Sequence, residues 1–222
     1  MAQQLKSHVS RIGLGLAAIG RPEYINIREH ADADKAEESY RLRAMDLLEF
    51  AYRKGIRDFD TAASYGKGEQ FLKEWYQDTR YPDVRLSSKW GYTYKANWEI
   101  GYNGPHEVKE HSLNKLQEQW SSAKELLPGL KTYQIHSATF ESGVLENRGV
   151  LDELHRIKKT DRIKIGLSVS GANQKDVVSE ASEVRVGGEE LFDSFQVTYN
   201  LLDTSTHEIL RKLIEKGKKV II

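Results

Sequence analysis

The sequence of 222 residues has no cysteine and no net charge, and each absence excludes a class of function. Without cysteine the chain can form no disulfide framework, no cysteine-ligated metal site and no thiol nucleophile, which fits a reducing compartment. Lysine plus arginine and aspartate plus glutamate both number 33. The chain therefore lacks the basic surface that is typical of proteins binding nucleic acid or an anionic membrane.

Long apolar runs are also missing. No run reaches the roughly 18 residues that a membrane helix needs, and residues 1–6 lack the apolar core of a signal peptide. Histidine and the acidic residues are scattered, without the spacing of a metal-binding helix, so no metal site is predicted. The composition predicts a soluble, cytoplasmic protein, and the absence of a linker predicts one domain over residues 1–222.

Strand and helix patterns alternate along the chain. Examples of helical signals are the apolar stripe from Ala44 to Ala51 and a capping box of Ser205 with Glu208, and Pro105 is expected to open a helix running to about Lys124. An aromatic-rich loop is expected over 90–105. Short apolar segments between the helices predict strands at 12–16, 56–60, 84–89, 132–136, 163–168, 195–199 and 218–222. This alternation predicts a parallel sheet with crossover helices.

An open doubly wound sheet and a closed barrel are the two arrangements to compare. Gly13 and Gly15 begin a G-x-G pattern but no glycine follows at the sixth position, so the dinucleotide fingerprint of the open sheet fails. Reactive side chains at the ends of successive strands favour the barrel. Such a barrel typically needs eight strands and about 250 residues. The expected fold is α/β, a TIM (β/α)8-type barrel truncated after the seventh strand.

Four side chains with complementary chemistry stand at or just after three consecutive predicted strands: Asp60, Tyr65, Lys89 and His136. A phenol has a pKa of about 10, too high for easy proton donation at neutral pH. An adjacent ammonium lowers that pKa, and a carboxylate can hold the ammonium in place. An imidazole adds a donor for a carbonyl oxygen. The set suits protonation of an oxygen while hydride reaches its carbon.

At these residues the chain resembles the aldo-keto reductase superfamily, and the resemblance covers nearly the whole length. Members of that family are (β/α)8 barrels that reduce aldehydes or ketones with NADPH, less often NADH. The matching motifs are Ile12-Gly13-Leu14-Gly15, Asp60-Thr61-Ala62-x-x-Tyr65-Gly66, Ser88-Lys89, Gln134-Ile135-His136, Ile165-Gly166-Leu167-Ser168 and Gln196-x-x-Tyr199-Asn200.

The resemblance implies a role for each matching residue. Tyr65 would donate the proton, Lys89 would lower the pKa of that phenol, and Asp60 would partner the lysine. His136 would orient the substrate carbonyl. The expected cofactor contacts are the nicotinamide ribose at Gly15 and Leu16, the carboxamide at Ser168 and Gln196, and stacking of the nicotinamide ring on Tyr199.

Two departures from the family pattern qualify these roles. Val169 stands where the family commonly has asparagine, so one carboxamide contact differs. The usual contacts to the cofactor's phosphates and adenosine come from loops after strands seven and eight, which lie beyond this sequence. An inactive module that binds a nicotinamide cofactor, or a fragment of a longer polypeptide, is therefore the alternative. The carbonyl substrate, the choice between NADP(H) and NAD(H), and a homo-oligomer stay open.

Overall fold

The computed structural model describes residues 9–23 and 35–222. Residues 1–6, whose composition argues against a signal peptide, lie outside this part. The chain forms two compact units, and each is described by itself. The first unit comprises the chain up to Ser88 together with 92–109 and 121–130. The second comprises 89–91, 110–120 and 131–222.

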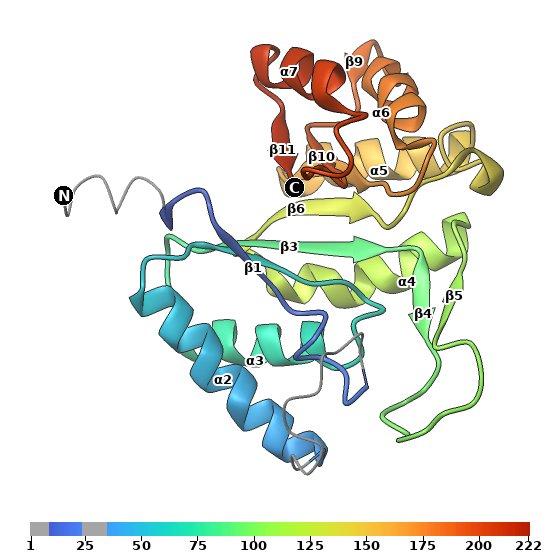
Figure 1. The fold of residues 1–222 in the computed structure, drawn as a ribbon. Coiled ribbons are helices and arrows are strands. Elements are labelled where there is room, and N and C mark those ends of the chain that lie inside the picture. The colour runs from blue at the N-terminus through green and yellow to red at the C-terminus, as the bar shows by residue number, and fades with distance from the viewer. Residues whose placement is uncertain (1–8, 24–34) are drawn as a thin grey trace. The chain divides into compact units, whose positions relative to one another are not determined.

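The first unit is built on parallel strands covered by two helices. Its strands are β1 (Gly13–Gly15), β2 (Asp58–Asp60) and the first part of β3 (Arg85–Trp90), in this order. Helices α2 (Glu37–Arg53) and α3 (Gly68–Thr79) lie side by side, as Figure 1 shows. Phe59 is fully buried, and its ring centroid lies 4.9 Å from that of Trp75 on α3. Because side chains alternate along a strand, Asp58 and Asp60 point to the opposite face from Phe59.

The predicted apolar stripe of α2 is confirmed in part, because Leu47 within it is 39% exposed. Ala44, Leu48 and Ala51 are buried on one face of the helix. Gly55 follows the helix with φ of +99°, a value that a side chain would strain. The helix therefore ends where the sequence predicted, and the chain turns directly into β2.

The segment predicted as a loop over 90–105 contains a strand, and the helix predicted to start at Pro105 starts later. Strands β4 (Tyr92–Tyr94) and β5 (Glu107–Lys109) pair antiparallel, and α4 (Leu113–Ala123) follows. The sequence signal for the helix start is Ser112, whose Oγ accepts a hydrogen bond from the Lys115 amide at 3.1 Å. A serine cap is a stronger start signal than Pro105, which precedes β5.

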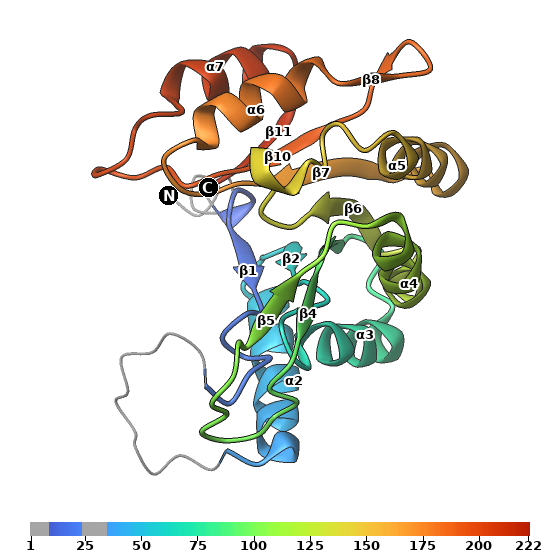
Figure 2. The ribbon, with the colours of Figure 1, turned by 90° about the vertical axis from the view of Figure 1, so that its right-hand side faces the viewer.

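The second unit holds the remaining parallel strands, most of α4 and three further helices. Its strands run in the order β6 (Leu130–Ile135), β7 (Lys164–Ser168), β10 (Ser194–Gln196) and β11 (Lys219–Ile221). Helix α5 (Arg148–Asp161) connects the first two strands, and α6 (Gln174–Glu183) and α7 (His207–Glu215) follow β7 and β10. Figure 2 shows α6 and α7 side by side over β10 and β11. Two 3-10 turns, η1 (Lys124–Leu126) and η2 (Phe140–Ser142), complete the elements.

Two local features differ from the sequence prediction. A short hairpin, β8 (Arg185–Val186) with β9 (Glu189–Glu190), turns at Gly187 and Gly188, both with positive φ. The predicted capping box of α7 is wrong, because Thr206 occupies the cap position and makes no side-chain cap bond. Ser205 instead donates to Asp203 Oδ1 at 2.7 Å. All seven predicted parallel strands are present.

Candidate active site

In the first unit the predicted acid, Asp60, stands at the end of β2. Its Oδ1 accepts a hydrogen bond from Ser87 Oγ at 2.7 Å. The Leu16 amide donates to Asp60 O, and the Thr61 amide donates to Ser87 O, both at 2.9 Å. These bonds continue the parallel register in which Gly15, Asp60 and Ser87 are neighbours. The ends of β1 and β2 therefore lie at one level, while β3 continues beyond them to Trp90.

Tyr65 lies in the tight turn between β2 and α3, and its ring is half-buried. The Tyr65 amide donates to Ala62 O at 3.0 Å, and Tyr65 O accepts from the Gly68 amide at 2.8 Å. Gly66 has φ of +59°. A Cβ at Gly66 would lie 2.2 Å from Gly20 O, so the loop after β1 packs backbone to backbone against this turn. The phenol therefore sits on a turn that is held by its own hydrogen bonds and by the loop after β1.

The predicted ribose-lining residues differ in exposure. Gly15 is exposed, and a Cβ there would meet nothing within 4 Å. The side chain of Leu16 is fully buried in the core. Open backbone at the end of a strand is what a ligand needs for a close approach, and Gly15 provides it.

In the second unit the predicted lysine is the last residue but one of β3, and the predicted histidine directly follows β6. Lys89 is 1% exposed. The His136 amide donates to the carbonyl oxygen of Trp90, the residue after Lys89, at 2.9 Å. His136 O in turn meets His111 Nε2 at 3.0 Å. Lysine is almost never fully buried without a partner, so burial of this amine is a functional signal.

The turn after Lys89 is held by side chains that the sequence did not single out. The Gly91 amide donates to Gln119 Oε1, and Gly91 O accepts from the Glu110 amide, both at 2.8 Å. Gly91 has φ of +106°, and a Cβ there would lie 2.2 Å from His111 Cδ2. Only glycine fits between this strand end and the imidazole.

The predicted carboxamide ligands, Ser168 and Gln196, end the next strands of this unit. Ser168 Oγ accepts from the Ser137 amide at 2.9 Å. Gln196 Oε1 accepts from Gln134 Nε2 at 3.2 Å. Gly166 on β7 lies beside this amide pair, where a Cβ would lie 2.7 Å from Ser194 O and 3.1 Å from Gln134 Oε1. Gln134 was missed as a site residue, although it precedes His136 by two positions and shares its face.

Val169 carries a backbone contact where the family pattern has a polar side chain. Its amide donates to Gln196 O at 2.9 Å, while its side chain is buried. The apolar side chain leaves the strand ends in register and offers no polar group to an amide ligand.

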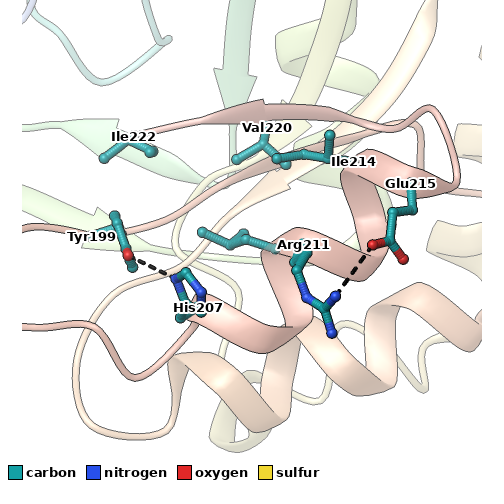
Figure 3. A pocket seen from close by; sticks show the side chains of 8 residues that line it. Tyr199, His207, Arg211, Ile214, Glu215, Val220 and Ile222 are labelled. Atoms are coloured by element: carbon teal, nitrogen blue, oxygen red, sulfur yellow. Dashed lines mark hydrogen bonds and ion pairs between the residues drawn. The ribbon is translucent and has the colours of Figure 1, made fainter.

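Tyr199 lines a pocket of about 330 Å³ at the edge formed by α7 and β11 (Figure 3). Its hydroxyl is hydrogen-bonded to His207 Nδ1 at 2.9 Å. The loop after β10, which carries Tyr199, is held by the buried side chain of Gln174, 1% exposed. Gln174 Oε1 accepts from the Thr198 amide, and Gln174 Nε2 donates to Thr198 O, both at 3.0 Å. The other residues lining the pocket are Leu210, Arg211, Ile214, Glu215, Val220 and Ile222.

One acidic residue near the strand ends was also missed. Glu69, on the first turn of α3, accepts hydrogen bonds from Ser88 Oγ and, at 3.4 Å, from Ser122 Oγ. Burial raises the pKa of the Glu69 carboxyl above its usual range, and these hydroxyl bonds offset only part of the increase. Ser88 directly precedes Lys89, so this carboxyl supports the strand that carries the amine.

Metal-binding clusters and membrane-spanning helices are both lacking within residues 9–23 and 35–222. No group of three or more histidine, aspartate or glutamate residues there could hold a metal ion. None of the helices in this part is long and apolar enough to cross a membrane.

A model of the aldo/keto reductase family matches residues 11–222. The chain belongs to this family. A comparison with curated proteins finds no match. The family assignment agrees with the resemblance that the strand-end motifs indicate.

Solved structures show the fold. PA4992 from Pseudomonas aeruginosa has 23% identity and a TM-score of 0.69, over 95% of this chain and 71% of that one. The aldo-keto reductase AKR11C1 from Bacillus halodurans, in its holo form, has 21% identity and a TM-score of 0.65, over 95% and 60%. The glycerol dehydrogenase AKR11B4 from Gluconobacter oxydans has 18% identity and a TM-score of 0.62, over 96% and 58%. The predicted fold class, a (β/α)8-type barrel represented here by seven parallel strands, is confirmed.

Proposed function

We propose that this aldo-keto reductase family member is an NAD(P)H-dependent oxidoreductase that reduces an aldehyde or ketone, or oxidises the corresponding alcohol. The observation that carries the proposal is the burial of Lys89, 1% exposed, on a strand bonded through its next residue to His136. An ammonium in this position has a chemical task in the family, which is to acidify a phenol. The family match over 11–222 supports the same reaction class.

Each residue has a defined part in the proposed reaction. Tyr65 Oη gives its proton to the carbonyl oxygen of the substrate, and Lys89 makes that phenol more acidic. Asp60 holds the ammonium. His136 donates a hydrogen bond to the same carbonyl oxygen and orients it. A bound nicotinamide supplies the hydride that reaches the carbonyl carbon.

Residues of each unit suit a nicotinamide cofactor. Gly15 offers open backbone, and the amide of Gln196 is held in a fixed orientation by Gln134. Ser168 adds a hydroxyl at the neighbouring strand end, and Tyr199 provides an aromatic ring for stacking. We propose NADP(H) as the cofactor with NAD(H) as the alternative, a small carbonyl compound as substrate, and a cytoplasmic location.

The test is an absorbance assay of nicotinamide oxidation over a panel of aldehydes, ketones and sugars. We expect Tyr65→Phe to lower kcat by about 10²–10⁴-fold, the usual contribution of a general acid. Tyr81→Phe is the matched control, because its phenol donates to Glu49 of α2 at 3.2 Å and is not one of the proposed site residues. Activity of Tyr65→Phe equal to that of the wild type would remove this phenol from the chemistry.

A cofactor titration of the same protein distinguishes a reductase from an inactive cofactor-binding module. Titration with NADPH and NADH, followed by tryptophan fluorescence, measures binding without requiring turnover. Binding at micromolar concentration, with no activity on the whole panel, would favour the binding module. Turnover that depends on Lys89, tested with Lys89→Met, would favour the reductase.

A further inference from the structure

A buried arginine, Arg21, lies against the ring of Tyr65. It is 4% exposed, and its Cζ lies 5.4 Å from the ring centroid of Tyr65 and 5.4 Å from that of Tyr94. Its Nη2 donates to Ser64 O and pairs with Glu107 Oε1 at 2.6 Å. One guanidinium thus contacts the turn that carries the phenol and both strands of the β4–β5 hairpin.

Only a guanidinium can make these contacts together. Its planar group presents several donors in a fixed fork and can also lie between aromatic rings, whereas a lysine ammonium is a compact, strongly hydrated point charge. Cation–aromatic attraction operates within about 6 Å of a ring centroid, and both rings lie inside that distance. Burial raises the pKa of the Tyr94 phenol, and a backbone hydrogen bond at Trp98 and the charge of Arg21 oppose part of the increase.

The backbone beside Arg21 is attached to the same turn. Gly20 O accepts a hydrogen bond from the Lys67 amide at 2.8 Å, and a Cβ at Gly66 would lie 3.0 Å from Arg21 Cγ. Main chain and side chain therefore hold the Tyr65 turn from one side. Because Glu107 neutralises much of the guanidinium charge at 2.6 Å, the effect on the phenol is mainly one of position.

We propose that Arg21 is a positioning residue for Tyr65: it fixes the ring of the phenol and couples it to the β4–β5 hairpin. The expected effect on the reaction rests on the proposed function, in which Tyr65 donates the proton. A fixed donor matters because a displacement of about 1 Å at a reacting group can cost about 10²-fold in rate. A change in the hairpin would therefore reach the chemistry through Arg21.

The chain offers a matched control for this arrangement. Arg57 packs on Tyr52 with its Cζ 4.0 Å from the ring centroid, pairs with Asp83 at 2.5 Å, and donates to Tyr52 O at 2.7 Å. It therefore combines the same three kinds of contact at a site outside the proposed catalytic residues. Comparing kcat of Arg21→Lys with kcat of Arg57→Lys separates an effect on Tyr65 from the general effect of losing a guanidinium that contacts a ring, a carboxylate and a carbonyl.

The experiment measures kcat, the two KM values, the melting temperature and the primary isotope effect with deuterated reduced cofactor. We expect Arg21→Lys to lower kcat at least tenfold and to raise the isotope effect, with the KM for cofactor within twofold. Arg57→Lys should leave kcat within twofold. An Arg21→Lys enzyme with wild-type kcat would overturn the proposal, as would an equal loss of kcat in Arg57→Lys.

A second readout does not depend on turnover. In protein labelled with ¹³C-tyrosine, the ring resonance of Tyr65 is assigned by its disappearance in Tyr65→Phe. It should shift or broaden in Arg21→Lys and in Arg21→Met, and stay unchanged in Arg57→Lys. An unchanged Tyr65 resonance in the folded Arg21 variants would contradict the positioning role. A fully active Tyr65→Phe instead removes the proposed function, so the two failures are distinguishable.

Discussion

Replacing Gly20 by alanine would drive the loop after β1 away from the Tyr65 turn. Gly20 has an ordinary backbone conformation, so only space forbids a side chain there. A Cβ would lie 2.0 Å from Tyr65 O, 2.6 Å from the Gly68 amide nitrogen and 2.8 Å from Gly68 Cα. All three neighbours are backbone atoms, which cannot move away as a flexible side chain can.

The size of the effect follows from these distances. Real Cβ atoms essentially never approach closer than 3.0 Å, so the two backbones must separate by about 1 Å from 2.0 Å. Overpacking of this kind costs about 1–3 kcal/mol, which lowers the melting temperature of a chain this long by about 2–12 °C. The hydrogen bond from the Lys67 amide to Gly20 O would lengthen, and displacement of the phenol would lower kcat by about 10²-fold.

Thermal unfolding followed by circular dichroism, together with kcat on the best carbonyl substrate, measures both effects. Gly13→Ala, in the preceding strand β1, is the control, because its Cβ would meet Asp58 at an ordinary 3.5 Å. We expect that variant to stay within about 0.5 kcal/mol of the wild type. A Gly20→Ala protein with unchanged melting temperature would show that the two loops do not pack as described, whatever the activity.

Three further substitutions test other parts of the molecule. Glu69→Gln should stabilise the protein relative to the wild type increasingly as pH rises above 4.5. The pKa of Glu69 is raised in the folded state, so the wild type loses about 1.4 kcal/mol of stability for each pH unit between the unfolded and the folded pKa. The loss is complete above the folded pKa. A difference in melting temperature between the two proteins that stays constant from pH 4 to 8 would contradict this. Gln174→Leu should lower the free energy of unfolding by about 2–4 kcal/mol, because the amide and carbonyl of Thr198 lose their partners, and urea titration measures it. Gly149→Ala, in the first turn of α5 with its Cβ 3.6 Å from Leu113 Cδ2, should instead stabilise by about 0.5 kcal/mol in the same titration, and a loss would argue against this helix start.

The parts of the site that lie on regular strands could be read from the sequence. Apolar runs marked the seven strands, and the polar residue that ends each run had to lie where the strand leaves the sheet. Asp60 and Lys89 are therefore found at strand ends as predicted. Whether Asp60, Tyr65, Lys89 and His136 act together stays a prediction for the variants described above.

Short hairpins and local caps were harder to predict. The strand β5 follows Pro105 and spans only Glu107–Lys109, too short for its side-chain alternation to stand out from a loop. The Gly187-Gly188 turn was a visible signal for the β8–β9 hairpin. The error at Ser205 arose because a nearby acceptor, Asp203, took the hydroxyl that the capping pattern had assigned to the helix.

By itself, the sequence determined the seven parallel strands, their alternation with helices and the residues at the strand ends, because the periodicity of a single segment sets both. Only the tertiary structure decided which side chains support them. Arg21 meets Glu107 across 86 residues and Ser64 across 43. Gln134 reaches Gln196 across 62 residues, over a glycine. Such contacts depend on the spacing of strands and loops after folding, and no local pattern along the chain encodes that spacing.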